Sequence, residues 1–280
     1  MNARRWTAMA AAAALGMGFA SCGGEELAET GEAETLRVGI AFQQPGLGHM
    51  EPDGTPTGFD VDVAAYIAWK LGYSPYEIEW EEVPYSIREQ KLIDGELDMI
   101  VAAYTITEER AEHIDFAGPY IVTGQDILVL ADNTTVAGVE GLAGLRVCSA
   151  ADTTSIARLE EILGDTAEIV PVNVFADCAD MLFSGEVDAM STDDLILAGF
   201  AATDELFGHV RIVGAPFSEE PLGIGLPKGS KGLCEQINAA LVEMVADGSW
   251  QKFIDRHTSG TGYAPSPDVN PPTPQPCADD

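Results

Sequence analysis

Arg110 lies in the first turn of a helix that the sequence predicts to begin after Thr107. The helix dipole disfavours a positive charge at this end. A carboxylate would remove the conflict, because it accepts a bidentate pair from the guanidinium and hydrogen bonds from the free helix N–H groups. The Thr105 hydroxyl is placed to assist. The residues therefore predict a carboxylate site, the alternative being a surface arginine paired with Asp or Glu.

A second carboxylate site is predicted at Thr153 and Thr154, which stand at the start of a predicted helix over 154–163. Their hydroxyls and the first backbone N–H groups would form the cradle, although a plain N-cap role is the alternative. Asp193 follows a predicted strand, at the end of the strand where ligands bind in open α/β sheets. Capping of the next helix by Asp193 or Asp194 is the competing interpretation.

Neither a metal site nor a cofactor site is predicted. The four histidines are scattered, without an acidic residue or Cys at ligand spacing. No glycine-rich phosphate loop and no nucleophile elbow occurs in the sequence. We therefore expect no cofactor and no catalytic residue.

Two similar βαβαβ units must position these residues. The first has strands over 36–41, 77–83 and 97–103, with helices over 58–71 and 87–93. The second has strands over 145–149, 167–172 and 187–191, with helices over 154–163 and 175–184. Each unit contains a Gly-acidic-apolar-Asp turn, at 95–98 and at 185–188.

The segments between and after these units suggest two lobes joined by two crossings. A loop is predicted over 115–120, a strand over 125–131 and a hinge at 132–135, with a second crossing at 216–221. A strand over 222–226 and helices over 233–247 and 250–257 follow. The predicted domains are lobe 1 over 36–130 and 221–260, lobe 2 over 131–220, and a Pro-rich tail over 261–280.

The N-terminus has the pattern of an export signal. Arg4 and Arg5 precede an apolar run over 6–19 that is too short to span a membrane. Small residues then lead to Cys22, as in a bacterial lipobox. We expect a signal over 1–21, lipidation of Cys22 and a flexible tether over 22–35; ordinary cleavage with a free Cys22 is the alternative.

The net charge of the chain limits its possible partners, and its cysteines indicate disulfide bonds. The chain has 14 basic and 46 acidic residues, a formal net charge of −32, which excludes nucleic acid as a partner. The four cysteines after Cys22 allow three disulfide pairings in an oxidising compartment. We favour Cys148 with Cys178 and Cys234 with Cys277. The second bond would then hold the tail on the body.

Several ordered segments resemble the family 3 solute-binding proteins of ABC transporters, over about residues 36–258. They are LRVGI (36–40), GFDVDVA (58–64), TITEER (105–110), IDFAGPY (114–120) and GEVDA (185–189). A further set is similar to the glutamate-binding branch of actinobacteria. This set comprises VCS (147–149), DC (177–178), TDDLILAG (192–199) and FSEE (217–220).

The resemblance implies a two-lobed α/β fold of the periplasmic-binding-protein type II and gives the site residues their roles. Arg110 would clamp the α-carboxylate with the help of Thr105, and Asp193 would accept the ammonium group. Arg88 matches an arginine that contacts the distal carboxylate in glutamate and aspartate binders. The family usually has Gly where this chain has Asp152, which weakens the assignment of Thr153 and Thr154.

Other residues near these positions allow two interpretations. Tyr85, Gln43 and Gln44 could line the pocket or serve the fold. Lys91 could add a positive charge to the site or be an ordinary exposed helix residue.

The resemblance predicts a monomeric binding lipoprotein on the outer face of the bacterial cytoplasmic membrane. It would deliver an acidic amino acid to the permease of an ABC transporter. Two arginines aimed into one cleft favour glutamate, while aspartate, glutamine and asparagine stay open. The alternative is an enzyme of the same fold, such as a dehydratase, or an amino-acid sensor domain. No spare acid or base is identified for catalysis, so we predict a binding protein.

Overall fold

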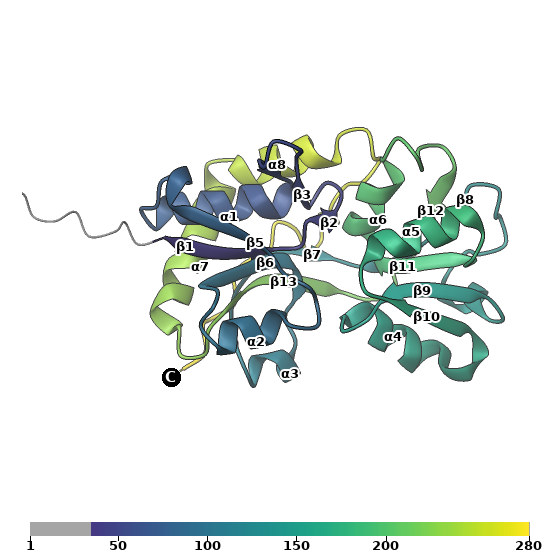
Figure 1. Cartoon of the computed structure of the whole chain (residues 1–280), viewed down its shortest axis with the longest axis horizontal. Coiled ribbons are helices and arrows are strands. Elements are labelled where there is room, and N and C mark those ends of the chain that lie inside the picture. The colour runs from purple at the N-terminus through teal and green to yellow at the C-terminus, as the bar shows by residue number, and fades with distance from the viewer. Residues whose placement is uncertain (1–34, 280) are drawn as a thin grey trace, which may run out of the picture. The chain divides into compact units, whose positions relative to one another are not determined.

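The computed structural model describes residues 35–279, which belong to one compact unit built around two five-stranded sheets (Figure 1). The predicted export signal, Cys22 and all but the last residue of the predicted tether lie outside the described residues. Within residues 35–279, no helix combines the length and apolar character needed to span a bilayer.

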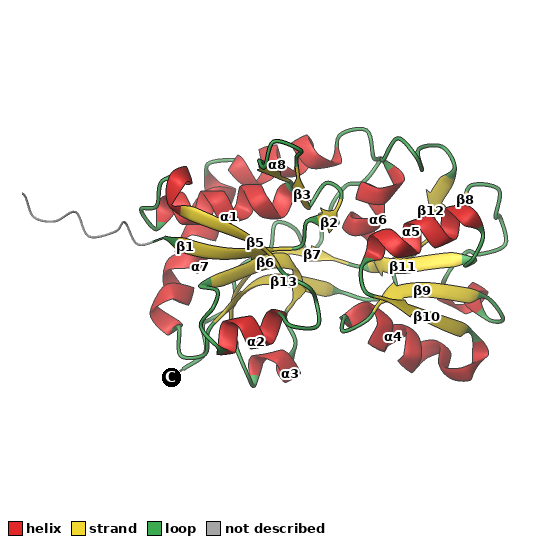
Figure 2. Cartoon of the chain, in the orientation of Figure 1, coloured by secondary structure: helices red, strands yellow, loops and turns green. Residues whose placement is uncertain are grey.

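The first sheet and its helices form the first lobe. Its strand order is β5-β1-β6-β13-β7; β1 pairs in parallel with β5 and β6, while β13 runs antiparallel to β6 and β7. The strands are β1 (Leu36–Ile40), β5 (Ile78–Glu82), β6 (Met99–Thr105), β7 (Asp115–Thr123) and β13 (Glu220–Leu226). The helices are α1 (Phe59–Lys70), α2 (Arg88–Ile93), α3 (Glu108–Ala111), α7 (Lys231–Ala246) and α8 (Ser249–Thr258). Figure 2 shows α1 and α8 on one side of this sheet and α2 and α3 on the other.

The second sheet and its helices form the second lobe. Its strand order is β10-β9-β11-β8-β12. The strands are β8 (Gln125–Leu130), β9 (Arg146–Ala150), β10 (Glu168–Val172), β11 (Ala189–Asp193) and β12 (Val210–Ile212). The helices are α4 (Thr154–Leu163), α5 (Phe175–Ser184) and α6 (Asp194–Ala201). A small sheet, β2 (Gln43–Gln44), β3 (Gly48–Met50) and β4 (Pro56–Thr57), and three 3₁₀ turns, Pro75–Glu77, Val139–Leu142 and Gly164–Thr166, complete the elements.

The repeated Gly-acidic-apolar-Asp turn has the same structural role in both lobes. Gly185 ends α5 in the left-handed conformation, with a φ of 79° that a side chain would disfavour. The Asp of each turn then binds the first strand of its own βαβαβ unit, β1 in the first lobe and β9 in the second. Asp98 accepts hydrogen bonds from the backbone and side chain of Arg37, and Asp188 does the same with Arg146. The internal similarity of the sequence is therefore a repeated strand-locking contact.

Two predictions for the segment between the two βαβαβ units are wrong. The predicted loop over 115–120 is part of β7, which tolerates Pro119 because it is an edge strand. The predicted domain boundary places residues 125–130 in lobe 1, but β8 pairs with β11 and β12 in the second lobe. The chain thus crosses at Gly124, and the polar stretch at 132–135 is a turn within the second lobe. An apolar run specifies a buried strand but not its partners.

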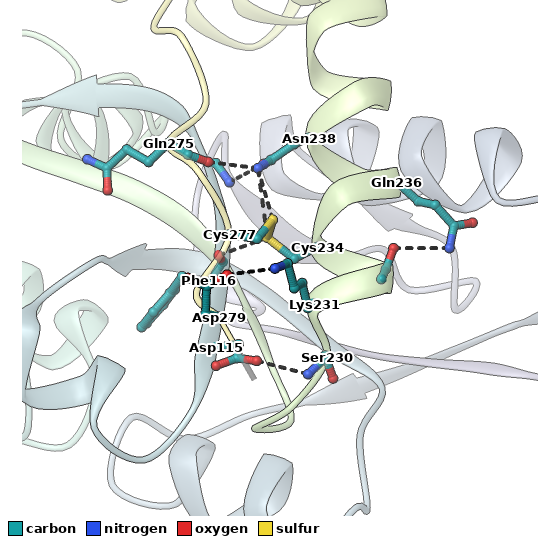
Figure 3. The surroundings of a disulfide bond; sticks show 12 residues. Asp115, Phe116, Ser230, Lys231, Cys234, Gln236, Asn238, Gln275, Cys277 and Asp279 are labelled. Carbon is teal, nitrogen blue, oxygen red and sulfur yellow. Dashed lines mark hydrogen bonds and ion pairs between the residues drawn. A yellow bond between two sulfur atoms is a disulfide. The ribbon is translucent and has the colours of Figure 1, made fainter.

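The tail beyond α8 runs back along the first lobe and has no helix or strand within 261–279. Asn270 makes two hydrogen bonds with the backbone of Val122 in β7, of 2.9 and 2.7 Å. Both favoured disulfides are present: Cys148–Cys178 joins β9 to α5, and Cys234–Cys277 joins α7 to the tail. Figure 3 shows Asn238 beside the second bond, donating to the Gln275 carbonyl at 2.9 Å. The disulfide and these polar contacts fix the tail.

Candidate functional site

A narrow cavity lies between the lobes. Eight of the ten residues that the sequence proposes for the site line it, although they come from distant parts of the chain. The lining consists of Gln44, Tyr85, Arg88, Ala103, Thr105, Arg110, Thr153, Thr154, Ser155, Phe175, Thr192, Asp193 and Ile196.

Arg110 is directed toward the cavity by the short helix α3. Thr107 caps this helix by accepting a hydrogen bond from the Arg110 backbone N–H at 3.2 Å. The guanidinium folds back over the turn and donates to the Thr105 carbonyl at 2.7 Å. Glu89, 3.6 Å from Nε, is the carboxylate nearest to it and is partly exposed. Burial lowers the pKa of Arg110 from its ordinary value, an effect that Tyr104 and Glu89 oppose.

Arg88 is buried without an acidic partner. Its side chain leaves the first turn of α2 and its guanidinium carbon lies 3.9 Å from the centre of the Tyr104 ring. One Nη donates to the Asp152 carbonyl of the second lobe at 3.3 Å, and Nε has no partner. Within residues 35–279, Arg88 forms no ion pair. Burial and then repulsion by Arg110 lower the pKa of Arg88 to about 10.

The second lobe presents the N-terminal end of α4 to these arginines. Thr153 is the N-cap: its hydroxyl donates to the Ala150 carbonyl and accepts from the Ile156 N–H at 3.3 Å. The capping alternative is therefore right for the Thr153 side chain. The Thr154 hydroxyl is free of the helix and lies 3.2 Å from the Thr105 hydroxyl across the cleft.

Asp152 occupies a backbone conformation that suits glycine better. Its φ is 58°, in the left-handed region. This explains why a glycine is usual at this position in the family that the sequence resembles. Asp is among the residues that tolerate the conformation best, so the departure keeps the shape of the turn before α4.

Asp193 ends β11 and occupies the N-cap position of α6 without making a side-chain capping bond. The capping alternative is therefore wrong for its carboxyl group. The residue is buried, and burial followed by repulsion from Glu220 and Asp194 raises the pKa of Asp193 well above its ordinary value. A cation placed beside this carboxylate would relieve the repulsion.

The remaining candidates separate into lining and surface residues. Gln44 is buried and donates to the Tyr85 hydroxyl at 2.8 Å, which leaves its own carbonyl oxygen without a partner. Burial raises the pKa of Tyr85 to about 12, so its hydroxyl stays protonated. Gln43 is exposed and Lys91 pairs with Glu81 and Glu96, so neither belongs to the cavity.

Five lining residues were not predicted. Ser155 and Thr192 are adjacent to predicted residues, and their hydroxyls lie 3.2 Å apart. Their positions in the sequence could therefore have identified them. Phe175 packs on the Tyr85 ring with 5.6 Å between centroids. Its place in an apolar helical pattern assigns it to a core, and Ala103 in a strand and Ile196 in a helix carry no polar group that would suggest a site.

The cavity suits a small ligand that carries both signs of charge. Its charged lining groups are two guanidiniums and one carboxyl group, a sum of +1 when Asp193 is ionised. Hydroxyls and the start of α4 supply hydrogen-bond donors for anionic oxygens. Among residues 35–279, no group of His, Cys, Asp and Glu side chains is placed to hold a metal ion.

Comparisons with known proteins agree with this geometry. The family model of bacterial extracellular solute-binding proteins, family 3, matches residues 36–260. Glutamate-binding protein GluB of Corynebacterium efficiens is 36% identical over 268 residues, which are 91% of this chain and 90% of that protein. ABC transporter glutamine-binding protein GlnH of Bacillus subtilis is 33% identical over 218 residues, covering 78% and 76%.

A solved structure shows the same arrangement. An ancestral arginine-binding protein bound to arginine superposes with a TM-score of 0.74 at 34% identity, covering 80% of this chain and 97% of that one. A structure of an ancestral arginine-binding protein bound to glutamine gives a TM-score of 0.73 at the same identity and coverage. The fold thus holds amino acids of different charge, and the lining residues must decide which one binds.

Proposed function

This chain belongs to the bacterial extracellular solute-binding proteins, family 3, and on that basis we propose that it captures an acidic amino acid. Glutamate is the ligand that we propose it prefers. The relatives described above are named as binding proteins, not as enzymes. We further propose that the loaded protein delivers its ligand, as a monomer, to the permease of an ABC transporter. Closure of the lobes around the ligand would create the surface that the permease recognises.

The observation that carries the choice of ligand is the buried guanidinium of Arg88, which forms no ion pair within residues 35–279. A buried charge without a partner is strongly destabilising, so the site requires a compensating anion. Arg110 also faces the cavity, and Asp193 balances only one of the two positive charges. A ligand with a net charge of −1 makes the sum zero. Glutamate meets this condition, whereas glutamine leaves +1 and arginine leaves +2.

Each ligand group has a matching partner on the cavity wall. Arg110, the Thr105 hydroxyl and the start of α4 at Thr153 and Thr154 would hold the α-carboxylate. Asp193 would accept the ammonium group. Arg88 would bind the distal carboxylate on the side where Tyr85 closes the pocket, and the free carbonyl of Gln44 would accept a ligand N–H.

Calorimetric titration tests the specificity. The chain without residues 1–22 is titrated with glutamate, aspartate, glutamine, asparagine and arginine. The variant Arg88→Met is compared with Lys91→Met, which removes the same charge from the same helix but outside the cavity. We expect Arg88→Met to weaken glutamate binding by about 30-fold or more and to leave glutamine binding nearly unchanged. Lys91→Met should bind glutamate as the parent does.

Preferential binding of glutamine or arginine by the parent would contradict the acidic specificity. So would equal loss of glutamate affinity in the two variants, since the loss would then reflect general charge and not a contact at Arg88.

We also propose export and lipid anchoring through Cys22. The sequence ahead of the folded unit supports this proposal by its charge, apolar run and small residues before Cys22. Cells expressing the full chain should hold it in the membrane fraction with an acyl group on Cys22, measured by mass spectrometry. Cys22→Ala should release an exported, soluble form, and retention of that variant in the membrane would contradict the proposal.

A further inference from the structure

Arg158 and Glu220 form an ion pair that joins the two lobes outside the cavity lining. Arg158 lies on α4, one turn after Thr154 and on the same face of that helix. Glu220 is the first residue of β13, where the chain returns to the first sheet. Arg158 Nε lies 3.2 Å from Glu220 Oε1. Because α4 belongs to the second lobe and β13 to the first sheet, this bond links the two lobes.

The pair is asymmetric in its burial. The Glu220 side chain is 2% exposed and that of Arg158 is 36% exposed. Glu220 Oε1 also accepts a hydrogen bond of 2.7 Å from the Ser218 hydroxyl, while Oε2 has no partner. Glu220 therefore depends on Arg158 for compensation of its charge, whereas Arg158 can turn toward water.

Glu220 also lies near the proposed ammonium site, because it pairs with Thr123 in β7 while Asp193 pairs with Gln125, only two residues further along the chain. Its carboxylate repels that of Asp193, and after burial this repulsion is the largest cause of the raised pKa of Asp193. Glu220 attracts the opposite charge of Arg110 and so favours its charged form. Four groups shift the pKa of Asp193: Glu220, Asp194, the Thr123 hydroxyl and Arg110. The charge of Asp193 in turn raises the pKa values of the phenols of Tyr85, Tyr120 and Tyr263. Closure without a ligand thus places two repelling carboxylates in one buried region.

We propose that the Arg158–Glu220 pair is a latch between the lobes that forms stably only when the ligand's ammonium group neutralises Asp193. The latch rests on the proposed function, because it requires an amino-acid ligand. Neither Arg158 nor Glu220 lines the cavity. They are positioning residues that couple occupancy of the site to closure.

The latch predicts unequal effects for the two partners of one ion pair. Arg158→Met leaves the Glu220 carboxylate buried beside Asp193 without compensation, which opposes closure. Glu220→Gln keeps an oxygen that can accept from Arg158 and removes the repulsion on Asp193. The double variant removes both the pair and the uncompensated charge, so it should recover most of the loss.

Stopped-flow binding with the amino acid that the parent binds most tightly measures these effects. We expect Arg158→Met to raise the dissociation rate about tenfold or more with little change in the association rate, and Glu220→Gln to change it less than about threefold. Arg146→Met is the matched control, because it breaks the Arg146–Asp188 pair within the second lobe, and its dissociation rate should equal that of the parent. Circular dichroism confirms that each variant folds.

A pH series separates the latch from a purely structural ion pair. Ligand binding requires an ionised Asp193, so affinity falls as the pH falls through the pKa of Asp193. Glu220→Gln lowers this pKa by removing a repelling charge, and the acid limb of its affinity profile should move to lower pH. An unshifted limb, a parental dissociation rate in Arg158→Met, or no recovery in the double variant would overturn the latch.

The same data distinguish failure of the latch from failure of the ligand assignment. Every amino acid brings an ammonium group, so the comparison decides the latch even when the parent prefers glutamine over glutamate. Absence of binding for all five amino acids by the parent would overturn both proposals.

Discussion

Gly199 offers a way to obstruct closure without altering any residue of the cavity lining. It lies in α6 of the second lobe, facing the Pro45 carbonyl in the loop between β2 and β3. A Cβ added at this position would lie 1.8 Å from the Pro45 oxygen, whereas real Cβ contacts essentially never fall below 3.0 Å. Gly199→Ala therefore requires α6 and this loop to separate by 3.0 less 1.8, or 1.2 Å.

Such a separation would break the hydrogen bonds that join the lobes at the cavity. The Thr105–Thr154 hydroxyl contact is 3.2 Å and the Arg88–Asp152 contact is 3.3 Å. Either contact, lengthened by that amount, leaves hydrogen-bond range. At about 1 kcal/mol each, the two losses give about 2 kcal/mol, equivalent to a roughly 30-fold increase in Kd. In the ligand-free open form, the same substitution should stabilise α6 by up to about 1 kcal/mol, because Ala has the higher helix propensity.

The expected result is therefore a variant that is at least as stable as the parent without ligand and binds its amino acid more weakly. Calorimetric titration and thermal denaturation, each with and without ligand, measure the two quantities. Gly232→Ala is the matched control, since it makes the same change in α7 where an added Cβ meets nothing within 4 Å. Parental affinity in Gly199→Ala would refute the inference that the lobes close through this contact.

Three further predictions concern stability. Replacing Cys234 and Cys277 with Ser should destabilise the fold by up to about 4 kcal/mol, the loop-entropy value for a 43-residue separation. The change should also expose residues 261–279 to limited proteolysis. A tail that stays protected from the protease would contradict the role of the disulfide. Asp152→Gly should raise the thermal midpoint by an amount equivalent to about 1 kcal/mol, because it relieves the backbone strain of a non-glycine residue at a φ of 58°. A lower midpoint would show that the Asp side chain contributes more to stability than this strain costs. Burial raises the pKa values of Asp60 and Asp194 to about 6, so between about pH 4 and 6 the folded state holds protons that the unfolded state releases. The free energy of unfolding should thus fall as the pH rises through this window, and it should fall less steeply in Asp60→Asn. Denaturation midpoints of the ligand-free protein that do not fall from pH 4 to 6 would refute this prediction.

Much of the fold could be predicted from local pattern. The helix over 154–163 and the helix over 175–184 have the predicted bounds, because a capping threonine or a left-handed glycine marks an end of each. The prediction of a loop over 115–120 is wrong, because residues that are typical of a loop lie in a strand here. Gly118 and Pro119 suggest a break in the chain, yet an edge strand accommodates them.

The sequence alone determined which side chains were available for binding, because an arginine at the start of a helix or an aspartate after a strand implies a ligand through local electrostatics. It also determined the two repeated lobes, through the hydrophobic periodicity and turns of each. Only the tertiary structure decided that β8 belongs to the second sheet and that Asp193 makes no side-chain cap for α6. It also decided that Arg88 is buried and forms no ion pair with another residue of 35–279. It alone revealed Glu220 beside Asp193 and Gly199 against Pro45. These relations depend on residues distant in the chain, and local propensity carries no information about the distances between them.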